Sequence, residues 1–189
     1  MGKKITVLSF LGGLGIGILG LVTLQFSQTH SKSPYVAQTD SPVHGLSPQE
    51  IDDLLNGRGA GYARMAELNS YPGPRHVLDL RQELRLSTDQ VEMIQTTFDS
   101  MQQEAQRLGE RIVTQEKQLS QAFATESITP ELLDQQTQDL ADLYGDLRLT
   151  HLQAHLVITP VLSAEQIEHY DQLRGYTEPS TVPHHHFGD

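Results

Sequence analysis

The amino-acid sequence predicts an all-α fold, a long antiparallel helical hairpin with short flanking helices. In two long stretches apolar residues recur in alternating steps of three and four, as in helices that pack lengthwise against each other. Ser or Thr stands at the start of most expected helices, where it can cap the first turn. No stretch alternates polar and apolar residues with a period of two, and no glycine-rich phosphate loop is present.

Residues 1–28 are interpreted as an N-terminal signal-anchor. Lys3 and Lys4 precede an uncharged run, Ile5–Phe26, of 22 residues. A helix of that length covers the hydrocarbon core of a membrane, and the two lysines place its start in the cytoplasm. A cleaved signal peptide is the alternative, although no small-x-small cleavage site follows the run. The sequence therefore predicts an uncleaved membrane helix, a linker at 29–44 and export of the rest of the chain across the membrane.

Short helices are expected first in the exported part, residues 45–176. Ser47 and Glu50 form a capping-box pattern around Pro48, and Gly57 or Gly59 can end that helix. Two prolines around a glycine predict a turn at 68–74. A second helix is expected from about residue 75 to 85, with an apolar face of Val77, Leu78, Leu80 and Leu84.

Two long helices are expected next. Ser87 caps the first, whose apolar seam runs from Val91 to Ala122 and includes Met101, read as a core residue in preference to a metal or cofactor ligand. Thr129 starts the second after a short connection, which makes the two helices antiparallel. Pro160 should end or kink it. A last short helix follows the cap at Ser163.

Charge is distributed unevenly along the chain. The net charge is −11, and the chain has no cysteine. Residues 1–40 carry +2 because three lysines oppose Asp40, whereas residues 41–189 carry 10 basic and 23 acidic side chains, or −13. An acidic domain favours cations and argues against nucleic acid as a partner.

A second apolar stripe, Leu149, Leu152 and Leu156, falls on the side of its helix away from the seam. An apolar stripe of this kind must be buried against another surface. We expect it to be covered by the short helices, by a second subunit of a homodimer, or by both if the short helices cover only part of it.

Two five-residue segments share one pattern and carry a family resemblance. They are Leu86–Gln90 (LSTDQ) and Leu162–Gln166 (LSAEQ), each at the start of a helix. They resemble the LTxxQ motif of the Spy/CpxP family, which includes ZraP and the CnrX-like periplasmic heavy-metal sensors. The stretches 66–78 and 170–176 are also similar to that subgroup. In both motifs Ser can cap the helix, and the glutamine, Gln90 or Gln166, can return a hydrogen bond to the cap backbone. The leucine, Leu86 or Leu162, packs beside the cap. The motifs are therefore expected to have a structural role.

The resemblance, which covers about residues 45–176, implies a non-enzymatic, often dimeric four-helix cradle in the periplasm. Proteins of this kind act in the envelope stress response, as chaperones for unfolded proteins or by binding metal ions. The alternative is a membrane-anchored heavy-metal sensor that signals to a membrane partner. The sequence itself has no catalytic triad order and no HExxH motif, so no enzyme is expected.

Histidines are the candidate metal ligands, for Zn²⁺, Cu²⁺ or Ni²⁺. His151 and His155 stand four residues apart on one helix, a spacing at which two imidazoles can share a metal ion. His76 follows the Pro-Gly-Pro turn and can face them. The other reading is that both helix histidines make polar contacts at a helix interface. Residues 177–189 are interpreted as a disordered tail, in which His184, His185 and His186 form a weak metal-collecting group or the remnant of a tag.

The match to CnrX-like sensors is incomplete. Their pattern has a His-xxx-His pair in the first core helix, where this chain has His76 and Leu80. It also has a glutamate in the second helix, for which Glu92 and Glu104 are the candidates here. A sensor site of that design therefore lacks part of its first pair.

Overall fold

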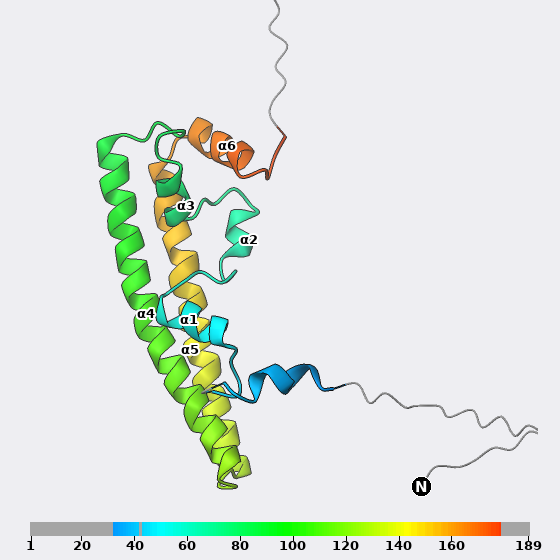
Figure 1. The fold of residues 1–189 in the computed structure, drawn as a ribbon. Coiled ribbons are helices and arrows are strands. Elements are labelled where there is room, and N and C mark those ends of the chain that lie inside the picture. Colours follow the sequence, from blue (N-terminus) through cyan, green and yellow to red (C-terminus); the bar gives the residue numbers. More distant parts are fainter. Residues whose placement is uncertain (1–31, 42, 179–189) are drawn as a thin grey trace, which may run out of the picture. The chain divides into compact units, whose positions relative to one another are not determined.

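The computed structural model describes residues 32–41 and 43–178, and all regular structure within them is helical (Figure 1). The predicted all-α class is confirmed. The chain divides into two units, residues 1–33 and 34–189, and the helices that follow belong to the second. None of the helices in the described ranges has the length and apolar character to span a membrane. The expected signal-anchor, 1–28, and the three tail histidines lie outside the described residues.

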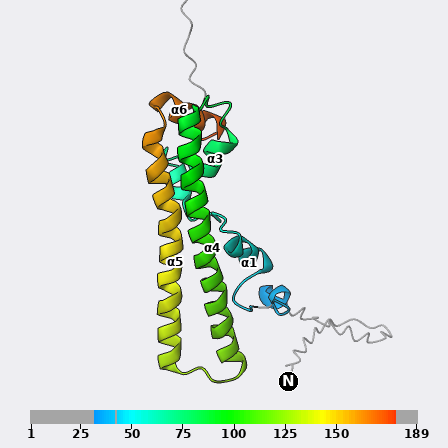
Figure 2. The same ribbon diagram turned by 90° about the vertical axis from the view of Figure 1, so that its left-hand side faces the viewer.

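Two long helices dominate the unit, α4 (Thr88–Ala124, 37 residues) and α5 (Pro130–Ile158, 29 residues). They run side by side in opposite directions and contact each other extensively (Figure 2). The hydroxyl of Ser87 caps α4 and that of Thr129 caps α5, as predicted. Residues 159–161 form the short 3₁₀-helix η2 around Pro160, whose missing N–H prevents a further α-helical turn.

The short elements precede and follow this helix pair. They are η1 (Pro34–Gln38), α1 (Pro48–Leu55), α2 (Arg64–Glu67), α3 (Pro74–Asp79) and α6 (Ala164–Leu173). The capping box of Ser47 and Glu50 is present, and Gly57 follows α1 with a φ of 61°.

The helix expected at 75–85 is wrong in its second half, because α3 ends at Asp79 and 80–85 form turns. There Arg85 adopts a left-handed φ of 48°. The Leu86 N–H donates a hydrogen bond to the Arg81 carbonyl, as is typical where a helical segment ends.

Buried side chains form two separate clusters. The central cluster joins α1 to the middle of α4 and α5 and comprises Val43, Leu46, Leu54, Ala105, Leu108, Ile112, Leu140, Leu143 and Leu147. The end cluster joins α3 and α6 to the ends of the long helices and comprises Val77, Leu84, Ile94, Ile158, Leu162 and Tyr170. Val43 belongs to the segment assigned to the linker, so the packed structure begins before residue 45.

The two LTxxQ-like motifs meet in the structure. Each Ser receives the backbone N–H of its Gln, and each Gln returns a bond to the Ser N–H, as predicted. In addition, Gln90 Nε2 lies 2.8 Å from Gln166 Oε1 and Gln166 Nε2 lies 3.2 Å from Gln90 Oε1. The glutamines therefore tie the start of α4 to the start of α6.

The second apolar stripe of α5 is only partly buried, since Leu152 is half-buried. Leu149 is 50% exposed and Leu156 is 61% exposed. The short helices therefore leave these two leucines open, and a second subunit stays the predicted cover for them.

Candidate functional site

A pocket of about 470 Å³ lies at the level of the gap between the two core clusters. Its wall on α5 is His151 and His155, and its wall on α4 includes Phe98 and Met101. The rest is lined by the connection between α1 and α2, by residues of α2 and α3, and by Tyr176. The predicted trio His76, His151 and His155 therefore lines one pocket.

Glu67, the last residue of α2, holds this region together. Its Oε1 accepts hydrogen bonds from the Gly73 N–H (3.1 Å) and from His76 Nδ1 (3.0 Å). Its Oε2 accepts them from the hydroxyls of Tyr170 (2.7 Å) and Tyr176 (3.2 Å). One carboxylate thus joins α2, the Pro-Gly-Pro turn, α3, α6 and the segment after α6.

Burial by itself would raise the pKa of Glu67, but the bonds from His76 and Tyr170 and the charges of His76 and His155 outweigh it and lower the pKa to about 2. Glu67 is therefore a carboxylate at neutral pH. Burial and this carboxylate raise the pKa of Tyr170, whose hydroxyl stays a donor.

His155 is positioned by the turn that follows α2. Its Nδ1 lies 2.7 Å from the carbonyl oxygen of Tyr71. A carbonyl only accepts, so Nδ1 donates, and whenever the ring is neutral its lone pair lies on Nε2. The ring lies against Gly73, where an added Cβ would come within 3.2 Å of His155 Nε2 and 2.6 Å of Glu67 Oε1.

His151 is a buried histidine of the pocket wall with one unsatisfied ring nitrogen. It is only 3% exposed, it stacks on the ring of Tyr62 at a centroid distance of 5.7 Å, and its Nε2 is buried without a hydrogen-bond partner. Burial, with a smaller effect of the nearby His155, lowers the pKa of His151 to about 4. The ring is therefore neutral at pH 7.

The expected metal ligands are only partly brought together. Within 32–41 and 43–178, no group of three or more His, Cys, Asp or Glu side chains is arranged so that it could hold a metal ion. His151 and His155 remain neighbours on α5, and His76 is turned by its Nδ1 bond toward Glu67.

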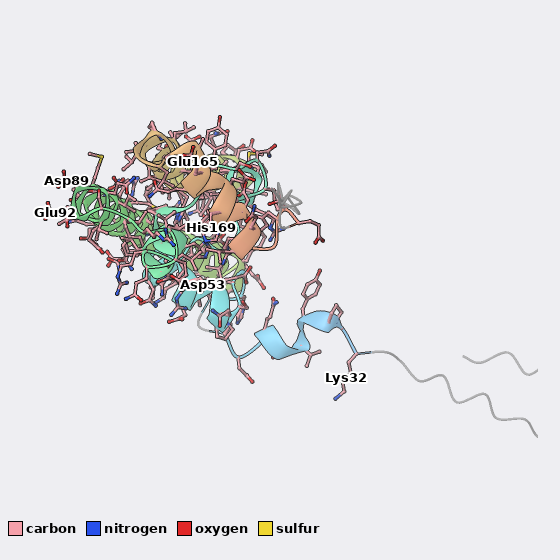
Figure 3. All side chains as sticks on the ribbon, turned by 90° about the horizontal axis from the view of Figure 1, so that it is seen from above. Lys32, Asp53, Asp89, Glu92, Glu165 and His169 are labelled. Carbon is pink, nitrogen blue, oxygen red and sulfur yellow. The ribbon has the colours of Figure 1, made fainter. Side chains whose placement is uncertain are left out.

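The two candidates for the glutamate of the CnrX-like pattern, Glu92 and Glu104, do not line the pocket. Glu92 is exposed and lies at the outer edge of α4, away from α6 (Figure 3). Glu104 pairs with Arg107 on the surface of α4. The pocket carboxylate is instead Glu67, which sequence reasoning missed. Its local signals were its place in the family-like stretch 66–78 and an acidic side chain five residues before Pro72.

Acid should destabilise the fold through protonation of His151 and of Glu67. His151, with a pKa near 4 against 6.5 unfolded, contributes stability that is complete above pH 6.5 and lost as pH falls to 4. Glu67 contributes stability that is complete above pH 4.5 and lost as pH falls to about 2. We expect urea unfolding to give a free energy at pH 4 that is lower than at pH 7 by about 3 kcal/mol. A His151→Phe variant should lose most of this dependence between pH 6.5 and 4, and an unchanged slope would contradict the assignment.

No family model matches the chain, and comparisons with curated proteins and with solved structures also find no match. Membership of the Spy/CpxP family stays a prediction based on the two motifs.

Proposed function

We propose that this chain is a non-enzymatic periplasmic protein of the Spy/CpxP type that binds one divalent transition metal ion, Zn²⁺, Cu²⁺ or Ni²⁺, through His151 and His155. In this proposal residues 1–28 anchor it to the inner membrane. The same site also suits the alternative role, a CnrX-like sensor that passes metal occupancy to a membrane partner.

The unpartnered Nε2 of His151 beside His155 carries the proposal. A buried polar nitrogen without a partner costs about 1–3 kcal/mol, and a metal ion that takes its lone pair removes that cost. The Nδ1 bond of His155 to the Tyr71 carbonyl is the kind of outer contact that orients metal-binding histidines and leaves Nε2 free for the ion.

The donor set fits a transition metal in part. Imidazole nitrogens suit Zn²⁺, Cu²⁺ and Ni²⁺. Two of them leave at least two further positions of a four-coordinate ion to be filled by other donors. His76 lines the same pocket with its Nδ1 engaged by Glu67, so its Nε2 is a third candidate donor.

Titration calorimetry of the full chain with Zn²⁺, in mild detergent, tests the site. His184, His185 and His186 are replaced by alanine throughout, so that the tail does not contribute heat. We expect His155→Ala to weaken Zn²⁺ binding by at least about tenfold. His169, an exposed histidine of α6, supplies the matched control, and His169→Ala should bind like the parent (Figure 3). Equal affinity of all three proteins would overturn the proposed site.

A second function is favoured by the exposed face of α5, where Leu149, Leu156 and Val157 are all at least half exposed. We propose that this face contacts a second copy of the chain, or unfolded clients, as in the cradle that the resemblance implies.

The absence of native cysteine allows a clean test of the homodimer. We expect Leu156→Cys in the full chain to form an intermolecular disulfide on mild oxidation. Leu173→Cys, at an exposed position of α6, should stay monomeric on non-reducing gels. Equal cross-linking of both variants, or of neither, would contradict a dimer through α5.

A further inference from the structure

The pocket is much larger than a metal ion requires. Its volume is about 470 Å³. A single water molecule occupies about 30 Å³ in the liquid, whereas pockets for small organic molecules begin at about 300 Å³. Two histidines and one ion would leave most of this space empty.

The charged side chains around the pocket are mostly cationic, although the chain as a whole carries −11. Arg58, Arg64 and Arg75 line it, and Glu67 is the one acidic residue among its lining side chains. Both oxygens of Glu67 already accept hydrogen bonds from the protein itself.

The three arginines differ in their partners. Arg58 is paired with Asp52 and Asp53, and Arg75 lies 3.9 Å from Asp79. Within the described part of the chain Arg64 forms no ion pair, and its guanidinium lies over Gly61 beside the pocket. Arg64 is therefore the cation best placed to meet an anionic ligand.

We propose that the pocket takes its metal ion as a complex with a small polycarboxylate, whose free carboxylate is bound by Arg64. This inference rests on the proposed function, because His151 and His155 hold the ion. The chelator supplies oxygen donors for the positions that two imidazoles leave open. A carboxylate and a guanidinium match in two parallel hydrogen bonds, which a bare hydrated cation cannot make. Phe98 and Met101 provide an apolar wall for the carbon skeleton.

Equilibrium dialysis of the full chain with the three tail histidines replaced by alanine tests the inference. The chain is dialysed against Ni²⁺, against citrate, and against both together, and retained nickel and retained citrate are measured separately. From the mixture we expect nickel and citrate to be retained in equal amounts. Arg64→Ala should weaken retention of the complex by about tenfold and leave retention of Ni²⁺ alone unchanged. Arg107→Ala removes one positive charge, as Arg64→Ala does, but Arg107 does not line the pocket. This variant should therefore behave like the parent.

The outcomes separate the two proposals. Nickel retained without citrate from the mixture would overturn this inference and leave the histidine site standing. Citrate retained equally with and without nickel would also overturn it, since the pocket would then be an anion site. No retention of nickel in any arm would overturn the proposed metal function itself.

Discussion

Gly109→Ala is expected to destabilise the folded chain by about 3 kcal/mol or more. A Cβ at Gly109 would lie 2.0 Å from the carbonyl oxygen and 2.6 Å from the carbonyl carbon of Leu54. Both are backbone atoms of α1, so no side chain can turn aside, and α1 must move away from α4. Leu54 is 5% exposed in the central cluster, which would be opened by that movement.

Gly145→Ala is the matched control for this prediction. Gly145 also lies inside a long helix, but no atom stands within 4 Å of the position of its Cβ. Alanine there should stabilise the chain by up to about 1 kcal/mol, because it favours the helix without meeting a neighbour. Urea unfolding, monitored by circular dichroism, measures the stability of both variants. Similar stability of both variants would show that α1 does not dock at Gly109.

Glu67→Ala is expected to lower the free energy of unfolding by about 3–5 kcal/mol, because it leaves the buried Gly73 N–H and Tyr170 hydroxyl without their acceptor. Tyr170 is fully buried, and its hydroxyl would lose the Glu67 carboxylate. The attachment of α6 and of the Pro-Gly-Pro turn to α2 would weaken together, since the same carboxylate serves both.

Glu104→Ala is the control for the loss of a carboxylate as such. Glu104 pairs with Arg107 on the surface, where the side chain is 43% exposed, and such pairs contribute about 0–1 kcal/mol. Thermal unfolding of both variants at pH 7 measures the difference. A Glu67 variant as stable as the Glu104 variant would contradict the role of Glu67 as a shared acceptor.

Local signals in the sequence predicted most helix starts, because capping is a short-range interaction. Ser47, Ser87, Thr129 and Ser163 all cap the helices expected of them. The four-residue α2 was missed because its N-cap, Ala63, makes no side-chain cap bond. The apolar spacing at 77–84 fits a helix and consecutive turns equally well, so it could not place the end of α3.

The three pocket histidines were predictable from the sequence, whereas the pocket carboxylate was not. The spacing of His151 and His155 indicated a shared face, and both line the pocket. Glu67 was not predictable, since its partners Tyr170 and Tyr176 are 103 and 109 residues away. Met101, expected in the core, lines the pocket instead, because the two buried clusters leave a gap at its level.

Electron paramagnetic resonance of the Cu²⁺-loaded chain shows whether His151 and His155 bind the ion, because it detects the ligand nitrogens themselves. The full chain is used with His184, His185 and His186 replaced by alanine. We expect a single copper species with imidazole nitrogen couplings, which is lost when His151 and His155 are both changed to alanine and kept in His169→Ala. A spectrum of aqueous copper, or one unchanged by the double substitution, would contradict a metal site at His151 and His155.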